Sequence, residues 1–131
     1  MKILDTDTCI ELLRGNRKVI EKRASVSDAV LTTWITAAEL YFGAAKSRDP
    51  AANRGLVDEF LETLSVLGLD QSSARHFGES KSTLEKEGEL IPDADLFIAS
   101  IALANRAEVV TGNQRHFVRI PGLTVEDWIR G

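Results

Sequence analysis

Short apolar segments of strand length alternate with longer segments of helical periodicity, and this alternation restricts the fold more than any other feature of the chain. The expected strands are residues 2–5, 29–35, 65–69, 107–112 and 122–128. The expected helices are residues 6–15, 16–25, 36–46, 50–64, 72–88 and 90–105. Strands that are separated by helices form parallel sheets with right-handed crossovers. The sequence therefore predicts an α/β domain with a central, mostly parallel sheet flanked by helices.

The composition agrees with a single domain of this kind and excludes some functional classes. The 131 residues suit a single core, and no apolar run approaches the ~18 residues of a membrane span. No signal peptide is recognisable and Cys9 is the one cysteine, so we expect a cytoplasmic protein without a disulfide. The net charge of −4 argues against a protein that simply coats nucleic acid. It permits a nuclease, because catalytic carboxylates themselves lower the net charge.

Carboxylate and amide side chains follow the expected strands. Asp5 ends the first strand, Glu39 lies in the first turn of the helix after the second strand, and Asn113 follows the fourth strand. Asp95 lies in the first turn of the helix at 90–105. Ligands of open parallel sheets bind at the carboxyl ends of the strands. We therefore expect these side chains to share one edge of the sheet.

Several of these acids also have a purely structural interpretation. Asp7 and Asp93 could cap helices. Thr36 and Glu39 have the spacing of a capping box. Asp95 could be present because the positive end of a helix dipole favours a carboxylate. Taken one at a time, the acids do not identify a functional site.

Together, the acids indicate a metal site. The helix at 90–105 is apolar on nearly every side and should be buried, whereas Asp5 has no expected helix to cap. Buried carboxylates that converge raise each other's pKa unless a cation neutralises them. Oxygen ligands select hard ions such as Mg²⁺ or Mn²⁺. We therefore predict a divalent ion at the mouth of the core.

Four segments together resemble a known family: ILDTDTCIELLRG, WITAAELYFGA, IPDADLFIASIALA and VVTGNQRHFVRIPGLTVEDW. They are similar to the PIN domain, and specifically to VapC-type toxins of toxin–antitoxin pairs. The resemblance spans residues 1–131 as a single PIN domain and implies a three-layer α/β/α fold. It further implies an endoribonuclease that depends on Mg²⁺ or Mn²⁺, with transfer or ribosomal RNA as plausible substrates. A homodimer and inhibition by a VapB antitoxin are implied as well.

The resemblance also implies roles for individual residues. The catalytic, metal-binding acids fall on Asp5, Glu39 and Asp95. The fourth acid of many members falls on Asn113, an amide, and Asp93 is a further candidate ligand that could supply the missing charge. Metal-activated water would attack the phosphorus and leave 5′-phosphate and 3′-hydroxyl ends. We predict accessory roles near the ion or the phosphate for three more residues, Thr6, Asp7 and Thr111.

Residues after the fourth strand and in the first helix complete the prediction. Arg115 and Arg119 are expected to contact RNA phosphates, although a solvated surface loop is the alternative. His116 is assigned to the surface or to packing, and Phe117 and Cys9 to the core. The helix at 6–15 and the segment that follows it, 16–22, are predicted to form an apolar groove for an antitoxin helix, although its leucines could simply be core residues.

Two rival functions remain open. Residues 5–9, DTDTC, approach the D-x-D-x-T/V nucleophile motif of haloacid-dehalogenase-type phosphatases, in which Asp5 would be phosphorylated, but Cys9 breaks the last position. The second rival is a PIN-like module that binds RNA or protein without cleaving it. Asn113 in place of an acid keeps this second possibility open.

Overall fold

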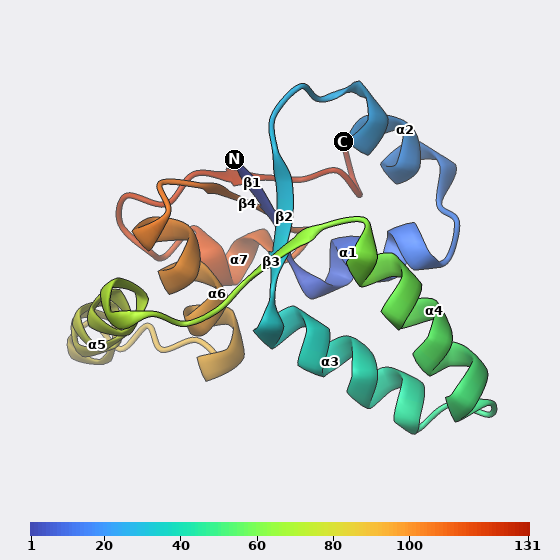
Figure 1. Ribbon diagram of the computed structural model, residues 1–131. Coiled ribbons are helices and arrows are strands. Elements are labelled where there is room, and N and C mark those ends of the chain that lie inside the picture. Colours follow the sequence, from blue (N-terminus) through green and yellow to red (C-terminus); the bar gives the residue numbers. More distant parts are fainter.

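A five-stranded parallel sheet forms the centre of the computed structural model, which describes residues 1–131 (Figure 1). The strands are β1 (Lys2–Leu4), β2 (Val30–Thr33), β3 (Ser65–Leu67), β4 (Glu108–Val110) and β5 (Val125–Glu126). Their order is β3-β2-β1-β4-β5, and every neighbouring pair is parallel. The chain leaves β1 toward β2 and β3 and later returns to the other side of β1 as β4. The boundary between β1 and β4 is therefore a topological switch point, where parallel sheets open a crevice.

Seven helices cover the sheet: α1 (Thr6–Leu13), α2 (Arg17–Ser25), α3 (Trp34–Ala45), α4 (Pro50–Glu62), α5 (Gln71–Lys86), α6 (Asp93–Ala104) and α7 (Gln114–Phe117). Adjacent strand residues point to opposite faces, and in β1 these are Ile3 and Leu4. Ile3 belongs to an apolar core with residues of α5, α6 and α7, and Leu4 belongs to a second core with residues of α1 to α4. This arrangement confirms the predicted three-layer α/β/α fold.

Helix α6, which corresponds to the helix expected at 90–105, is buried as predicted. Leu96, Ile98 and Ile101 of α6 are completely inaccessible to solvent. Cys9 and Phe117 are also completely buried, which confirms their predicted core positions. No helix of the structure combines the length and the apolar character that crossing a bilayer requires.

Side chains at the ends of the strands decide where the following helices begin. Thr33 ends β2, and its hydroxyl accepts a hydrogen bond from the backbone N–H of Thr36 at 3.2 Å. The expected strand at 29–35 thus extends two residues too far at its C-terminal end, because Trp34 already begins α3. The interpretation of Thr36 and Glu39 as a capping box was wrong, since Thr36 lies inside the helix. Glu39 consequently lies in the second turn of α3, not in the first.

Two further expectations are corrected by the fold. Asp5 does have a helix to cap: it is the N-cap of α1, and its Oδ1 accepts a hydrogen bond from the backbone N–H of Thr6 at 2.8 Å. The segment after β4 is not an irregular loop, because Gln114–Phe117 form the short helix α7. Its brevity, a single turn, explains why no helical periodicity was detectable.

Candidate functional site

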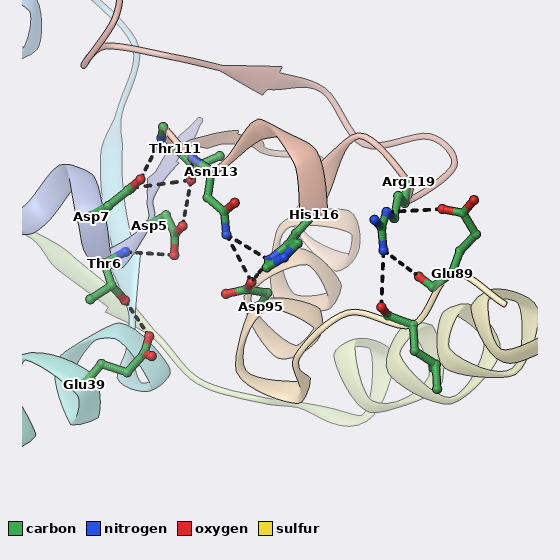
Figure 2. A network of polar contacts seen from close by, with 12 residues as sticks. Asp5, Thr6, Asp7, Glu39, Glu89, Asp95, Thr111, Asn113, His116 and Arg119 are labelled. Carbon is green, nitrogen blue, oxygen red and sulfur yellow. Dashed lines mark hydrogen bonds and ion pairs between the residues drawn. The ribbon is translucent and has the colours of Figure 1, made fainter.

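Asp5 lies at the switch point, directly after β1, and is almost completely buried, with 4% of its surface exposed. Its Oδ2 accepts a hydrogen bond from the Thr111 hydroxyl at 2.7 Å, so the ends of β1 and β4 are joined through this carboxylate (Figure 2). Burial raises the pKa of Asp5 to about 7. The hydrogen bonds from Thr111 and Thr6 act against this rise, whereas the nearby charges of Asp7 and Asp95 add to it.

Asp7 is the second acid of the cluster and is half-buried. Its Oδ2 accepts a hydrogen bond from the backbone N–H of Gly112 at 2.9 Å, and its Oδ1 lies 3.4 Å from the Thr111 hydroxyl. Burial raises its pKa as well, and the Gly112 N–H opposes that rise. Gly112 fits tightly: a Cβ there would lie 3.0 Å from the Asp7 carboxylate and 3.0 Å from the Ile129 side chain, so these side chains would have to shift to make room.

Asp95 projects from the first turn of α6 toward the residues that follow β4. Its Oδ2 lies 2.7 Å from Nδ1 of His116 and 3.5 Å from Nδ2 of Asn113 (Figure 2). Nδ2 of Asn113 is also 2.8 Å from Nδ1 of His116. His116 holds the Asp95 carboxylate when its Nδ1 carries the proton, and Nδ1 in that tautomer does not also accept from Asn113.

Glu39 reaches the cluster from the opposite side through Thr6. The Thr6 hydroxyl donates a hydrogen bond to Oε1 of Glu39 at 2.6 Å, and it also lies 3.2 Å from the Thr36 hydroxyl. The Thr6 backbone N–H at the same time binds Asp5. Glu39 itself is exposed to solvent. Thr6 thus links an exposed, movable acid to the buried one.

The remaining predicted residues are not part of this cluster. Asp93 forms an ion pair with Lys81 of α5 at 3.0 Å. Arg119 forms an ion pair with Glu89 at 3.2 Å and donates to backbone carbonyls of the loop between α5 and α6, on the far side of α7 from the acids (Figure 2). Arg115 is exposed on α7 and has no bonded partner in the structure.

The structure adds His116, Gly112 and Arg130 to the residues around the acids. His116 was predicted to have a surface or packing role, yet it pairs with Asp95. Because α7 is too short to show helical periodicity, no sequence signal marked this pairing. The contact of Arg130 with the Gly112 carbonyl joins segments 18 residues apart. No local sequence pattern predicts such a contact.

The chemistry of these donors suits a hard cation, although the side chains as they stand do not form a closed ligand shell. No three acidic, histidine or cysteine side chains converge on a common point at ligand distances. The hydrogen-bond donors to Asp5 and Asp7 are all neutral hydroxyl or backbone N–H groups. A divalent ion would supply the positive charge that these carboxylates lack.

Comparison with known proteins agrees with the fold. Residues 2–123 match the PIN domain family. The tRNA(fMet)-specific endonuclease VapC of Salmonella typhimurium is 36% identical over 127 residues, which cover 96% of both chains. Ribonuclease VapC2 of Haemophilus influenzae is 34% identical over 128 residues, covering 97% of both.

Solved structures give the same assignment. The crystal structure of VapBC2 from Rickettsia felis, bound to a DNA fragment from its promoter, contains a chain that superposes with a TM-score of 0.91. That chain is 30% identical, and the match covers 97% of this chain and 98% of the other. The present chain therefore belongs to the PIN domain family and, within it, to the VapC ribonucleases.

Proposed function

We propose that this chain is the toxin of a VapBC-type pair: an endoribonuclease that hydrolyses RNA phosphodiester bonds with the help of Mg²⁺ or Mn²⁺ and is inhibited by a VapB-type antitoxin. The observation that carries this proposal is the buried carboxylate of Asp5, with the half-buried carboxylate of Asp7 beside it, at the switch point of the sheet. The similar proteins are named ribonucleases. Two neighbouring carboxylates, one buried and one half-buried, are unfavourable when both are ionised and become favourable beside a cation.

Three acids would hold the ion: Asp5, Asp95 and Glu39. When bound, the ion supplies Lewis-acid chemistry, which polarises a phosphate oxygen and lowers the pKa of water. Asp5 is held from two sides, by Thr6 and Thr111, so its two oxygens have a defined orientation. Glu39 is exposed and can rotate toward the other two acids. Asp93 is committed to Lys81 and is a weaker candidate for a ligand.

Neighbouring side chains would orient the acids and leave the scissile phosphate within their reach. Asn113 and His116 contact Asp95, and Thr111 orients Asp5. Asn113 occupies the position of the family's fourth acid and would keep the geometry without adding charge. Asp7 supplies a further negative charge close by, fixed by the Gly112 N–H. Arg115, exposed and unpaired, would contact the RNA backbone.

The first substrate to test is the initiator transfer RNA, because the relative from Salmonella typhimurium is named for tRNA(fMet). A phosphatase of the haloacid-dehalogenase type is not supported. Both oxygens of Asp5 already accept hydrogen bonds, and Cys9, the residue that breaks that motif, is completely buried. The family implies that two copies of the chain form the active toxin.

An apolar groove beside the acids would receive the antitoxin. A cavity of about 660 Å³ is lined by α1, α3 and α4, with Ile10, Leu13 and Leu56 among its apolar residues. Thr6 and Glu39 lie in the same lining, so a helix in this groove would reach the acidic cluster. The prediction of a groove along α1 is retained, but its second wall is formed by α3 and α4 and not by residues 16–22.

The decisive experiment incubates a tRNA(fMet) transcript with the purified chain in Mn²⁺, in Mg²⁺ and in EDTA. We expect cleavage with either ion and none in EDTA. The variant Asp95→Asn should lose cleavage, whereas Asp93→Asn, two residues away on the same helix turn, should cleave like the wild type. RNA binding without cleavage in any ion would instead establish the non-cleaving module.

A further inference from the structure

The C-terminal segment folds back onto the turn after β4 and brings Arg130 beside the acidic cluster. Nη1 of Arg130 donates a hydrogen bond to the carbonyl of Gly112, the residue whose N–H binds Asp7. A Cβ on Gly112 would lie 3.0 Å from the Asp7 carboxylate and 3.4 Å from Nη1 of Arg130. Gly112 thus contacts the Arg130 guanidinium through its carbonyl and Asp7 through its N–H.

The backbone around Arg130 holds this position. Oδ1 of Asp127 accepts hydrogen bonds from the N–H groups of Ile129 and Arg130, at 2.8 and 3.0 Å. Oδ2 of Asp127 lies 3.5 Å from Nη1 of Arg130. The base of the side chain and one of its nitrogens are thus fixed before any ligand arrives, which lowers the entropy cost of a further contact.

Most of the hydrogen-bonding capacity of Arg130 remains free. A guanidinium has five N–H donors, and both contacts of the Arg130 guanidinium use Nη1. Nε and Nη2 have no hydrogen-bond partner, and 72% of the side chain is exposed. Arg119 differs, because Glu89 and two carbonyls already occupy its guanidinium.

The negative charge around the site suggests a function for the free N–H donors of Arg130. The chain carries a net charge of −4 and gathers acids at the site, so the local field repels a phosphate backbone. A fixed arginine at the rim of the cluster offsets this repulsion and matches the geometry of phosphate oxygens. We propose that Arg130 binds a backbone phosphate of the RNA next to the scissile bond. This inference rests on the proposed ribonuclease function.

The test measures binding of a labelled, mixed-sequence single-stranded RNA of about twelve nucleotides by fluorescence anisotropy, in EDTA and over a roughly sixfold range of KCl. Loss of one phosphate contact lowers the slope of log Kd against log salt by ~0.7 for a single strand. We expect Arg130→Ala to show this decrease and to weaken binding about three- to tenfold at low salt. Arg130→Lys, which keeps the charge, should restore the slope. Arg106→Ala, at the opposite edge of the sheet, is the matched control and should leave slope and affinity unchanged.

Cleavage kinetics separate phosphate binding from a purely structural role. For tRNA(fMet), Arg130→Ala should raise KM and leave kcat within about twofold. A wild-type slope in Arg130→Ala, together with a lower kcat, would show that Arg130 only supports the Gly112 turn and would overturn the inference. If the wild-type chain binds and cleaves RNA, that outcome leaves the ribonuclease function intact. If the wild type neither binds nor cleaves RNA, the proposed function fails and the inference fails with it.

Discussion

Replacing Asp5 by Asn should stabilise the metal-free protein at neutral and alkaline pH, although it removes a residue proposed to be catalytic. Burial raises the pKa of Asp5 from 3.8 to about 7. One pKa unit corresponds to ~1.36 kcal/mol, so ionised Asp5 lowers the free energy of unfolding by about 4 kcal/mol. Asn is neutral, is as good an N-cap as Asp, and can still accept the hydrogen bond from the Thr6 N–H.

The pH range of this effect follows from the direction of the shift. Folded Asp5 binds its proton more tightly than unfolded Asp5. The contribution of Asp5 to the free energy of unfolding is therefore complete below about pH 4 and is lost as pH rises through about 7. At pH 8 in EDTA, Asp5→Asn should exceed the wild type by about 4 kcal/mol, a rise in Tm of roughly 12 °C. At pH 4 the two should unfold alike. Saturating Mn²⁺ should stabilise the wild type and leave the variant nearly unaffected.

Urea unfolding followed by tryptophan fluorescence measures these differences, since Trp128 is buried and will report loss of the core. Asp28→Asn, a change at an exposed acid between α2 and β2, serves as the matched control and should leave the pH dependence unchanged. If Asp5→Asn is less stable than the wild type at pH 8 in EDTA, the ionised carboxylate is favourable in the folded state. The argument that the cluster requires a cation would then be refuted.

Three further substitutions test other parts of the site. Glu39→Gln should lower the cleavage rate about 10²-fold or more. It should change the free energy of unfolding by less than about 0.5 kcal/mol, because the side chain is exposed. An unchanged cleavage rate would show that Glu39 is not part of the site. Gly112→Ala should reduce the metal affinity measured by calorimetry, because the new Cβ would lie 3.0 Å from side-chain atoms of Asp7 and Ile129. An unaltered affinity would show that these side chains can move to accommodate the Cβ. Leu56→Glu should weaken antitoxin binding at least about tenfold in a pull-down titration and leave cleavage intact, because it places a charge in an apolar groove. An unchanged affinity would show that the antitoxin binds elsewhere.

The meeting of Asp5 and Asp95 with the residues after β4 was predictable from sequence, because it follows from a rule about sheets. Parallel strands present their carboxyl ends at one edge, so residues that follow β1 and β4 must be neighbours if those strands pair. The buried α6 was equally predictable from its apolar character on all sides. Neither inference depends on the direction of any one side chain.

Side-chain partners were less predictable. Asp93 and Asp95 are two residues apart, and positions i and i+2 of a helix face different directions, so one acid meets Lys81 while the other meets His116. Arg119 lies close in sequence to the site but meets Glu89, 30 residues earlier in the chain. Sequence proximity in a helix is a poor guide to orientation, and strand-length patterns leave element ends uncertain by a few residues.

The sequence by itself determined the class of fold, the burial of α6 and the edge of the sheet at which the acids gather, because these depend on hydrophobic periodicity and on the geometry of parallel strands. Only the tertiary structure decided that Asp5 and Asp7 are surrounded by neutral donors, that His116 contacts Asp95, and that Arg130 reaches Gly112. Such contacts join segments far apart in the chain. Their energies arise from desolvation and from hydrogen bonds that exist only once the segments have packed together.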